Sequence, residues 1–158
     1  NYISDNRVDK LGLMLDLGII RTNQVLYTYE NYLFTNHISL FDFAIKYNSI
    51  PVIELFLKYG HNLNEKNYSG VTPLMNCVNK VYISEQLYLM RYLLDKGANP
   101  NIENKSGYIA MDYISVRTFI RYLIKDMLRE YGSREGTIND YESEDYLDNY
   151  EDDEYDSQ

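Results

Sequence analysis

Apolar residues recur at every third or fourth position in several short stretches of the chain, which is the spacing of one helix face. The clearest stretch is 67–102, where Leu74, Cys77 and Val78 mark a short helix. A second helix follows, and its apolar residues are Leu87, Leu89, Met90, Leu93 and Leu94. Neither helix can bury its apolar face alone. The pattern therefore predicts neighbouring helices that share the same design.

Local signals mark where these two helices begin and end. Ser69-Gly70 indicates a tight turn in which the glycine takes a positive φ. Thr72 is a good N-cap, and Pro73 suits the first helical position because no N–H is needed there. Gly97 follows the second helix as a C-terminal stop. The stretch is thus predicted as a turn, a helix, a turn, a helix and a glycine stop.

Both kinds of signal occur more than once along the chain. The helix ending before a glycine is found at 13–18, 55–60 and 93–97, as LMLDLG, LFLKYG and LLDKG. The turn sequence Asn-x-Ser-Gly is found at 67–70 and again at 104–107. A period near 33 residues, with a turn and two helices in each unit, indicates a stacked helical repeat.

Two segments within 67–103 resemble the ankyrin repeat. Residues 70–74, GVTPL, resemble its G-x-T-P-L-H opening, and residues 93–101, LLDKGANPN, resemble its L-L-x-x-G-A-D-x-N close. Met75 stands where the family has histidine, so the usual side-chain bond from that position to the threonine is expected to be absent. The resemblance covers roughly residues 1–130 and implies an all-α ankyrin-repeat solenoid of about three to four units.

The stretch 34–66 is a weaker copy of the repeat. Ser39-Leu40-Phe41-Asp42 stands for T-P-L-H, and His37 takes the place of the turn glycine. Its helices are expected at about 40–47 and 51–59. The predicted divisions are 1–33 (a partial unit and linker), 34–66, 67–103 (with four extra residues around Tyr82 to Glu85), 104–132 (a capping unit) and an acidic tail at 133–158.

The two ends of the array depart from the pattern. Residues 1–20 look like the second half of a unit whose first helix is missing, which implies a preceding segment, or else Tyr2 and Ile3 form a stub that caps the array. Residues 21–33 are expected to form a short extra helix or an ordered loop.

In 104–132 the second inter-helix turn is hard to find, so its two helices are expected to be fused or shortened. The apolar positions with helical spacing are Met111, Ile114, Phe119, Leu123, Ile124, Met127 and Leu128. A basic stripe is expected on the other side of this helix, at Arg117, Arg121, Lys125 and Arg129.

The acidity of the chain is concentrated at its C-terminus. The net charge is −9, yet residues 1–136 carry all 15 basic residues and 14 of the 24 acidic ones. No lysine or arginine follows Arg134, and the tail beyond it is rich in tyrosine. Such a composition cannot bury enough apolar surface to fold alone, so the tail is expected to be disordered.

Nothing in the sequence indicates catalysis. His37 and His61 lie in predicted turns with no second group of metal ligands, and no nucleophile elbow, phosphate loop or dinucleotide fingerprint is present. We expect no enzyme, no cofactor and no metal, and with no long apolar run or signal peptide we expect an intracellular protein. Cys77 is expected to be a buried hydrophobe. Nucleic-acid binding by the nearly neutral body is disfavoured.

The resemblance implies that the concave face, built from hairpin tips and inner helices, binds a protein partner, and that the chain is a monomer or a fragment of a longer array. The candidate residues are Lys46, Tyr47, Lys66, Tyr68, Ser69, Val71, Asn79, Lys80, Lys105, Ser106 and Tyr108. The loose repeats are similar to those of poxviruses and other large DNA viruses, which implies a role against host proteins. The alternative is a regulatory appendage of a longer chain, whose acidic tail binds a basic partner, inhibits the chain itself or mimics nucleic acid.

Overall fold

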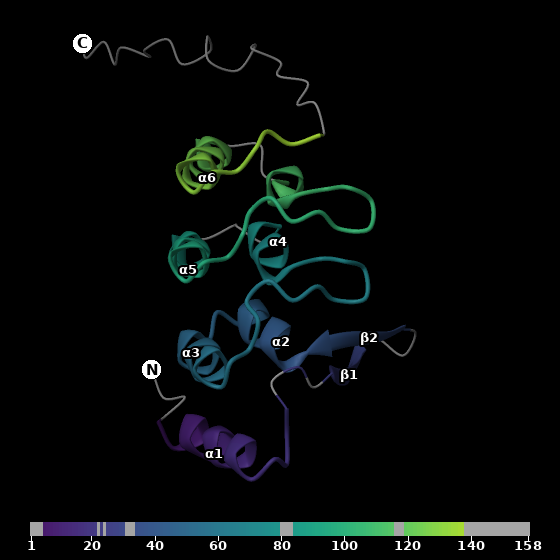
Figure 1. Ribbon diagram of the computed structural model, residues 1–158, viewed down its shortest axis with the longest axis vertical. Helices are drawn as coiled ribbons and strands as arrows, with labels where there is room; N and C mark the ends of the chain where they lie inside the picture. Colours follow the sequence, from purple (N-terminus) through teal and green to yellow (C-terminus); the bar gives the residue numbers. More distant parts are fainter. Residues whose placement is uncertain are drawn as a thin grey trace, which may run out of the picture.

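Short helices stacked in two columns form the molecule (Figure 1). The computed structural model describes residues 5–21, 23, 25–30, 34–79, 84–115 and 119–137. Its elements in chain order are α1 (Asp5–Asp16), β1 (Val25–Glu30), β2 (Phe34–Ser39), α2 (Leu40–Lys46), α3 (Ile50–Lys58), α4 (Pro73–Val78), α5 (Ser84–Asp95), the 3-10 turn η1 (Ala110–Tyr113) and α6 (Phe119–Glu130).

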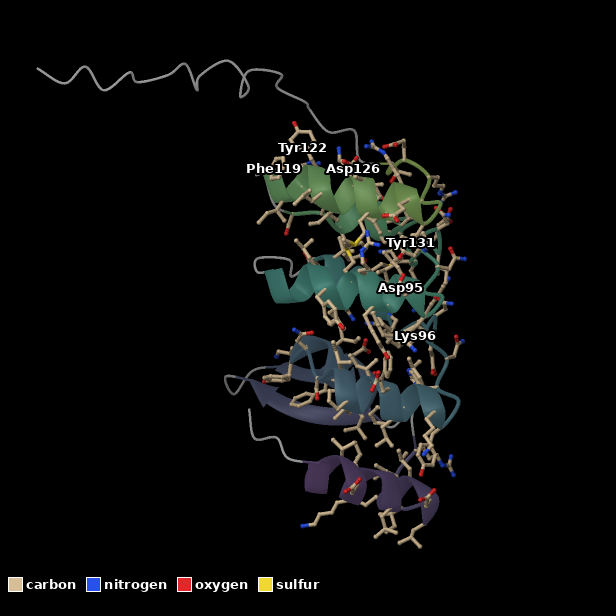
Figure 2. All side chains as sticks on the ribbon, turned by 90° about the vertical axis from the view of Figure 1, so that its left-hand side faces the viewer. Asp95, Lys96, Phe119, Tyr122, Asp126 and Tyr131 are labelled. Atoms are coloured by element: carbon tan, nitrogen blue, oxygen red, sulfur yellow. The ribbon has the colours of Figure 1, made fainter. Side chains whose placement is uncertain are left out.

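Helices α1, α3, α5 and α6 form the outer column, and α2, α4 and η1 form the inner one (Figures 1 and 2). Each inner element packs on the next one, α2 on α4 and α4 on η1. Inner helices also pack on their outer partners, α2 on α3 and α4 on α5. This arrangement confirms the predicted helical solenoid, because each short helix buries an apolar face that it could not bury alone.

The core runs through the whole stack between the two columns. Apolar side chains from successive elements meet there, so that one continuous cluster links α1 to α6. The largest fully buried side chains are Phe41, Ile53, Phe56, Leu74, Met75, Val78, Leu89, Met90, Leu93, Ile109, Ile124 and Leu128. Cys77 is buried among them, as expected for a small apolar position.

The predicted cap of α4 is present, and α2 has an equivalent cap at Ser39. Thr72 precedes α4, and its hydroxyl oxygen accepts the Met75 N–H at 3.3 Å. Ser39 does the same for α2, accepting the Asp42 N–H at 2.9 Å. The expectation that Met75 makes no bond to the threonine was wrong, because its sulfur accepts the Thr72 N–H at 3.4 Å. A thioether is a weak acceptor, yet it occupies the place of the usual partner.

Glycines end the outer helices at equivalent positions. Gly60 follows α3 with φ of 76°, and Gly97 follows α5 with φ of 95°. In each case the amide of the residue after the glycine donates to a carbonyl in the last turn of the helix, His61 to Phe56 and Ala98 to Leu93, as in a left-handed C-cap. Gly132 takes the same position after α6, a fourth stop that the sequence pattern did not align with the others.

A β-hairpin replaces the helix or loop expected in 21–33. Strand β1 pairs antiparallel with β2, and the pair opposes Tyr27 to His37. The sequence pattern placed His37 at the turn position of the 34–66 unit. It lies instead in strand β2, so that expectation was wrong. Valine and tyrosine at alternate positions of β1 favour extended backbone. The hairpin lengthens the connection into α2 and leaves the helical stack as predicted (Figure 1).

The last two elements show that the inner helix is shortened, not fused, because η1 is a single 3-10 turn. Three expectations for α6 were wrong. Phe119 is 73% exposed and Leu123 is also exposed, since no described element covers that side of α6 (Figure 2). Lys125 is only 7% exposed, so the expected basic stripe is interrupted. Arg121 donates to the Ile114 carbonyl, and the stripe's Arg117 lies outside the described residues.

Several expectations fall where the structure gives no description. Tyr2, Ile3, the residues of the insertion before Ser84 and the tail beyond Thr137 lie outside the described residues. Among the helices that are described, none combines the length and apolar character needed to cross a membrane.

Candidate functional site

Two loops with the same internal structure project from one side of the stack, beside the β-hairpin (Figure 1). In the first loop the Asn67 side-chain oxygen accepts the N–H groups of Ser69 at 2.9 Å and Val71 at 3.0 Å. In the second, Asn104 accepts the N–H groups of Ser106 at 2.8 Å and Tyr108 at 3.0 Å. Asparagine favours such side-chain-to-backbone turns, so both tips are fixed by their own sequence.

The tip of the first loop lies directly against the second. Gly70 has φ of 80°, and a Cβ added to it would lie 2.7 Å from the Lys105 backbone nitrogen. That nitrogen donates to the Ser69 carbonyl at 3.4 Å. Glycine is needed here both for the left-handed backbone and for the close approach. The loops are therefore stacked and positioned relative to each other.

Stacking brings together two of the predicted binding residues. Tyr68 and Lys105 occupy the same place in successive loops, and the Lys105 ammonium lies 4.3 Å from the centroid of the Tyr68 ring. Tyr68 is 89% exposed. A cation over an aromatic face is attracted by the ring quadrupole, so this contact holds the two exposed side chains together. We call the surface made by residues 66–71 and 103–108 the hairpin face.

Other predicted residues of the hairpin face are also accessible. Lys66, Ser69, Ser106 and Tyr108 are exposed. Val71 is half-buried and packs against the core, so it offers little surface.

A second group of predicted residues lies at the ends of the inner helices. Lys46 and Tyr47 end α2, with the Lys46 ammonium 5.8 Å from the Tyr47 ring centroid, and Phe43 lies 4.5 Å from the same ring. Asn79 ends α4 and its carbonyl accepts from the Ser115 hydroxyl at 3.4 Å. Lys80 lies outside the described residues.

Asparagines at the base of the loops tie them to one another. The Asn64 side chain donates to the Gly97 carbonyl at 3.3 Å and accepts the Asn99 N–H at 2.8 Å. Asn101 makes the equivalent two bonds, both at 2.7 Å, to the backbone that follows α6. Backbone groups left open at the helix ends are thus satisfied by the neighbouring loop.

A cavity of about 170 Å³ lies between the base of the β-hairpin and the first loop. The residues that line it are Asn23, Ser39, Asp42, His61, Glu65, Lys66, Asn67, Tyr68 and Pro73. The Asp42 side chain is almost fully buried, and its two oxygens accept from the Ser39 hydroxyl at 2.8 Å and the Asn76 amide at 3.2 Å.

His61 is the unusual residue of this cavity. It is 8% exposed, its ring centroid lies 4.1 Å from that of Phe41, and its Nδ1 has no hydrogen-bond partner. The Glu65 Oε2 atom lies 3.8 Å from this Nδ1. Burial lowers the pKa of His61, against the opposing effect of the Glu65 and Asp42 carboxylates. The sequence predicted His61 as a turn residue and gave no sign that its ring is buried.

On the outer column, tyrosines join successive helices. The Tyr59 hydroxyl donates to Asp16 on α1, and the Tyr131 hydroxyl donates to Asp95 on α5 (Figure 2). These bonds raise the pKa of both tyrosines, since each acid stabilises the neutral phenol. Helices α5 and α3 are joined by Tyr92, whose hydroxyl donates to Glu54 at 3.3 Å. Burial and the nearby Glu54 carboxylate raise the pKa of Tyr92 to about 12. These bonds serve the stack.

The part of the chain that the structure describes shows no cluster of metal ligands. No three His, Cys, Asp or Glu side chains come together there as metal ligands. The hairpin face offers aromatic, cationic and amide groups. Such groups suit binding rather than bond cleavage.

Comparison with known proteins identifies the repeat. Residues 69–105 match the family model described as the ankyrin repeat. The chain is similar to FPV222, a fowlpox virus protein named for its ankyrin repeats, with 34% identity over 94 residues, which is 60% of this chain and 12% of that protein. A similar protein of Acanthamoeba polyphaga mimivirus, L92, is 33% identical over 78 residues, which is 49% of this chain and 18% of the other.

Solved structures show the same architecture. The ankyrin repeat domain of Bcl-3 superposes with a TM-score of 0.56 and 23% identity, covering 77% of this chain and 48% of that one. The ankyrin repeat protein EF0377 gives a TM-score of 0.53 and 19% identity, over 80% of this chain and 58% of the other. The fold and its stacked loops therefore define a repeat protein whose helix pairs share one core.

Residues 69–105 therefore form an ankyrin repeat, within a stack of helices that has the fold of an ankyrin-repeat domain. Ankyrin repeats are protein-interaction modules. It spans less than a fifth of the length of the two viral relatives.

Proposed function

We propose that the chain is a non-catalytic module that binds a protein partner through the hairpin face and the adjoining ends of α2 and α4. The observation that carries the proposal is the Tyr68–Lys105 pair, a highly exposed ring with an ammonium 4.3 Å above it. Tyrosine gives a large contact area at low conformational cost, and here the Lys105 ammonium restrains the ring. A preorganised aromatic and cationic surface favours recognition.

Charge supports a partner with acidic and apolar groups at this site. Lys66 and Lys105 are exposed on the hairpin face beside Tyr68 and Tyr108. Glu103 on the same face is already paired with Arg134. A partner surface that places a carboxylate beside an apolar side chain would complement this patch.

The test is partner capture with matched variants. Tyr68, Lys105 and Tyr108 changed to alanine should abolish capture, because these residues form the exposed part of the hairpin face. Lys58, Tyr88 and Tyr122 changed to alanine remove similar exposed groups from the outer column and should leave capture intact. If both triple variants bind equally, the proposal is wrong.

Similarity to viral proteins supports a finer proposal, that the partner is a host protein inside the infected cell. The chain has a single cysteine, the buried Cys77, which is compatible with a reducing compartment. The rival function, a regulatory appendage that acts through its acidic tail, predicts that capture is lost on deletion of 137–158 and collapses with moderate salt. Capture that survives this deletion and depends on Tyr68 excludes the rival.

A further inference from the structure

The cavity beside the first loop contains an unsatisfied buried acceptor. In a neutral imidazole one nitrogen carries the proton and the other accepts, and the lowered pKa of His61 keeps the ring neutral near pH 7. Its Nδ1 is buried and has no partner within the described residues. Leaving a buried polar atom unbonded is unfavourable, so this atom marks a place where a further group is accommodated.

The charged groups around this atom attract a cation. The Glu65 carboxylate lies 3.8 Å from His61 Nδ1, and the buried Asp42 carboxylate also lines the cavity. Both carboxylates favour a positive charge at the imidazole. The Asp42 oxygens each accept one bond and have capacity for more. The cavity thus offers the His61 nitrogen and two carboxylates as acceptors.

Stacking of the repeats does not require this polar pair. Counting from the glycine stops, His61 corresponds to Ala98, and Glu65 corresponds to Ile102. The second loop stacks with the same asparagine bonds and the same turn. A histidine and a glutamate at this one junction therefore add something that the array itself does not use.

We propose that this cavity receives the guanidinium group of an arginine side chain from the protein partner. A guanidinium is planar, with N–H donors along several edges, so it can bond to Nδ1 of His61 and to the Glu65 carboxylate together. It is also more weakly hydrated than an ammonium, which eases its burial. The volume of about 170 Å³ greatly exceeds the roughly 15 Å³ that one water needs.

The inference rests on the proposed function, because Tyr68 belongs both to the cavity wall and to the hairpin face. A partner bound to the hairpin face could therefore place a side chain in the cavity while it remains on that face. Arginine in the cavity and an acidic group near Lys105 would then fix the partner's direction along the face.

The experiment uses N-acetyl-arginine-amide as the probe, added to the full chain at constant ionic strength. Binding is followed by NMR, through the His61 ring nitrogens and the backbone amides of residues 61–68; His37→Gln assigns the histidine signals. We expect saturable shifts with the arginine probe, no shifts with N-acetyl-citrulline-amide, and binding weaker by about tenfold with N-acetyl-lysine-amide.

Matched variants locate the site. Glu65→Gln should weaken the arginine probe by about tenfold, since it removes one charge without changing shape, and Glu103→Gln on the second loop should not. The double variant His61→Ala with Glu65→Ile copies the second loop; it should fold, by circular dichroism and thermal unfolding, and lose the shifts.

Three results would overturn the inference: no saturable shift with the arginine probe, equal shifts with citrulline, or equal effects of Glu65→Gln and Glu103→Gln. Tighter binding of free arginine than of the capped probe would also overturn it, by indicating an amino-acid site instead of a side-chain pocket. None of these tests uses the protein partner. The hairpin-face proposal therefore stands or fails separately, by capture with the Tyr68, Lys105 and Tyr108 variant.

Discussion

The loops 60–70 and 97–107 share a sequence pattern that holds the stack, but they present different side chains to the cavity and to solvent. They share the positions that hold the stack, namely a glycine stop, the bridging asparagine and the turn asparagine with its glycine. They differ where side chains face the cavity or solvent: His61 against Ala98, Glu65 against Ile102, and Tyr68 against Lys105. The comparison teaches that shared positions satisfy the backbone, while the differing positions are available for recognition.

The largest difference in stability loss between equivalent substitutions in the two loops is expected at their turn glycines. Gly70→Ala should lower the free energy of unfolding by about 3 kcal/mol, because it combines a left-handed backbone with a clash against the Lys105 nitrogen. Gly107→Ala should cost about 1 kcal/mol, since its Cβ would meet no atom within 4 Å. Urea unfolding of both variants measures this. Equal losses would show that the loops are not in contact.

The bridging asparagines come next. Asn64→Ala should cost about 1.5 kcal/mol, because the Gly97 carbonyl and the Asn99 N–H both lose their partner. Asn62→Ala serves as the control, since among the described residues its side chain accepts just the nearby Asn64 N–H. The cost should be about 0.5 kcal/mol. A larger loss for the control would contradict the bridging role.

A smaller difference between the two loops is expected in the pH dependence of stability, because only the first loop contains a histidine. The folded chain holds the pKa of His61 below the value of about 6.5 in the unfolded chain, so between these two values unfolding takes up a proton. Stability should be complete above pH 6.5 and should fall as the pH drops below it. In His61→Ala, which copies the second loop, this part of the decline should vanish in unfolding measured from pH 5 to 8. An unchanged slope would place the titration on other groups.

The smallest effect on stability is expected at the loop tip. Tyr68→Ala should cost about 0.5 kcal/mol, the value of one exposed cation–π contact, because the ring is otherwise in water. Thermal unfolding measures that change. The same variant should nevertheless lose most of its partner binding. A large loss of stability would show that the ring supports the fold and weaken its assignment to recognition.

Local chemistry let the sequence predict most of the fold. Thr72 with Pro73 starts α4, and Gly60 and Gly97 stop the outer helices, since caps and left-handed turns depend on a few adjacent residues. The predicted helices 40–47 and 51–59 agree with α2 and α3 within a residue or so for the same reason. The resemblance to ankyrin repeats then supplied the stacking.

Exposure in the last unit could not be predicted from spacing alone. Phe119 has the periodicity of a core residue and lies in solvent, whereas Lys125 has that of a surface residue and is buried. The periodicity of an isolated helix shows which residues share a face, but it cannot show which faces a neighbour will cover. Long lysine stems can also cover apolar surface.

The sequence by itself thus determined the turns, the caps, the glycine stops and the repeated helix pair, because each is decided within a few residues of chain. Only the tertiary structure decided that β1 and β2 pair as a hairpin, that the Lys105 ammonium lies over Tyr68, and that His61 closes a cavity with Asp42 and Glu65. Those outcomes depend on contacts between residues far apart in the sequence, and the stacking of one repeat on the next creates them.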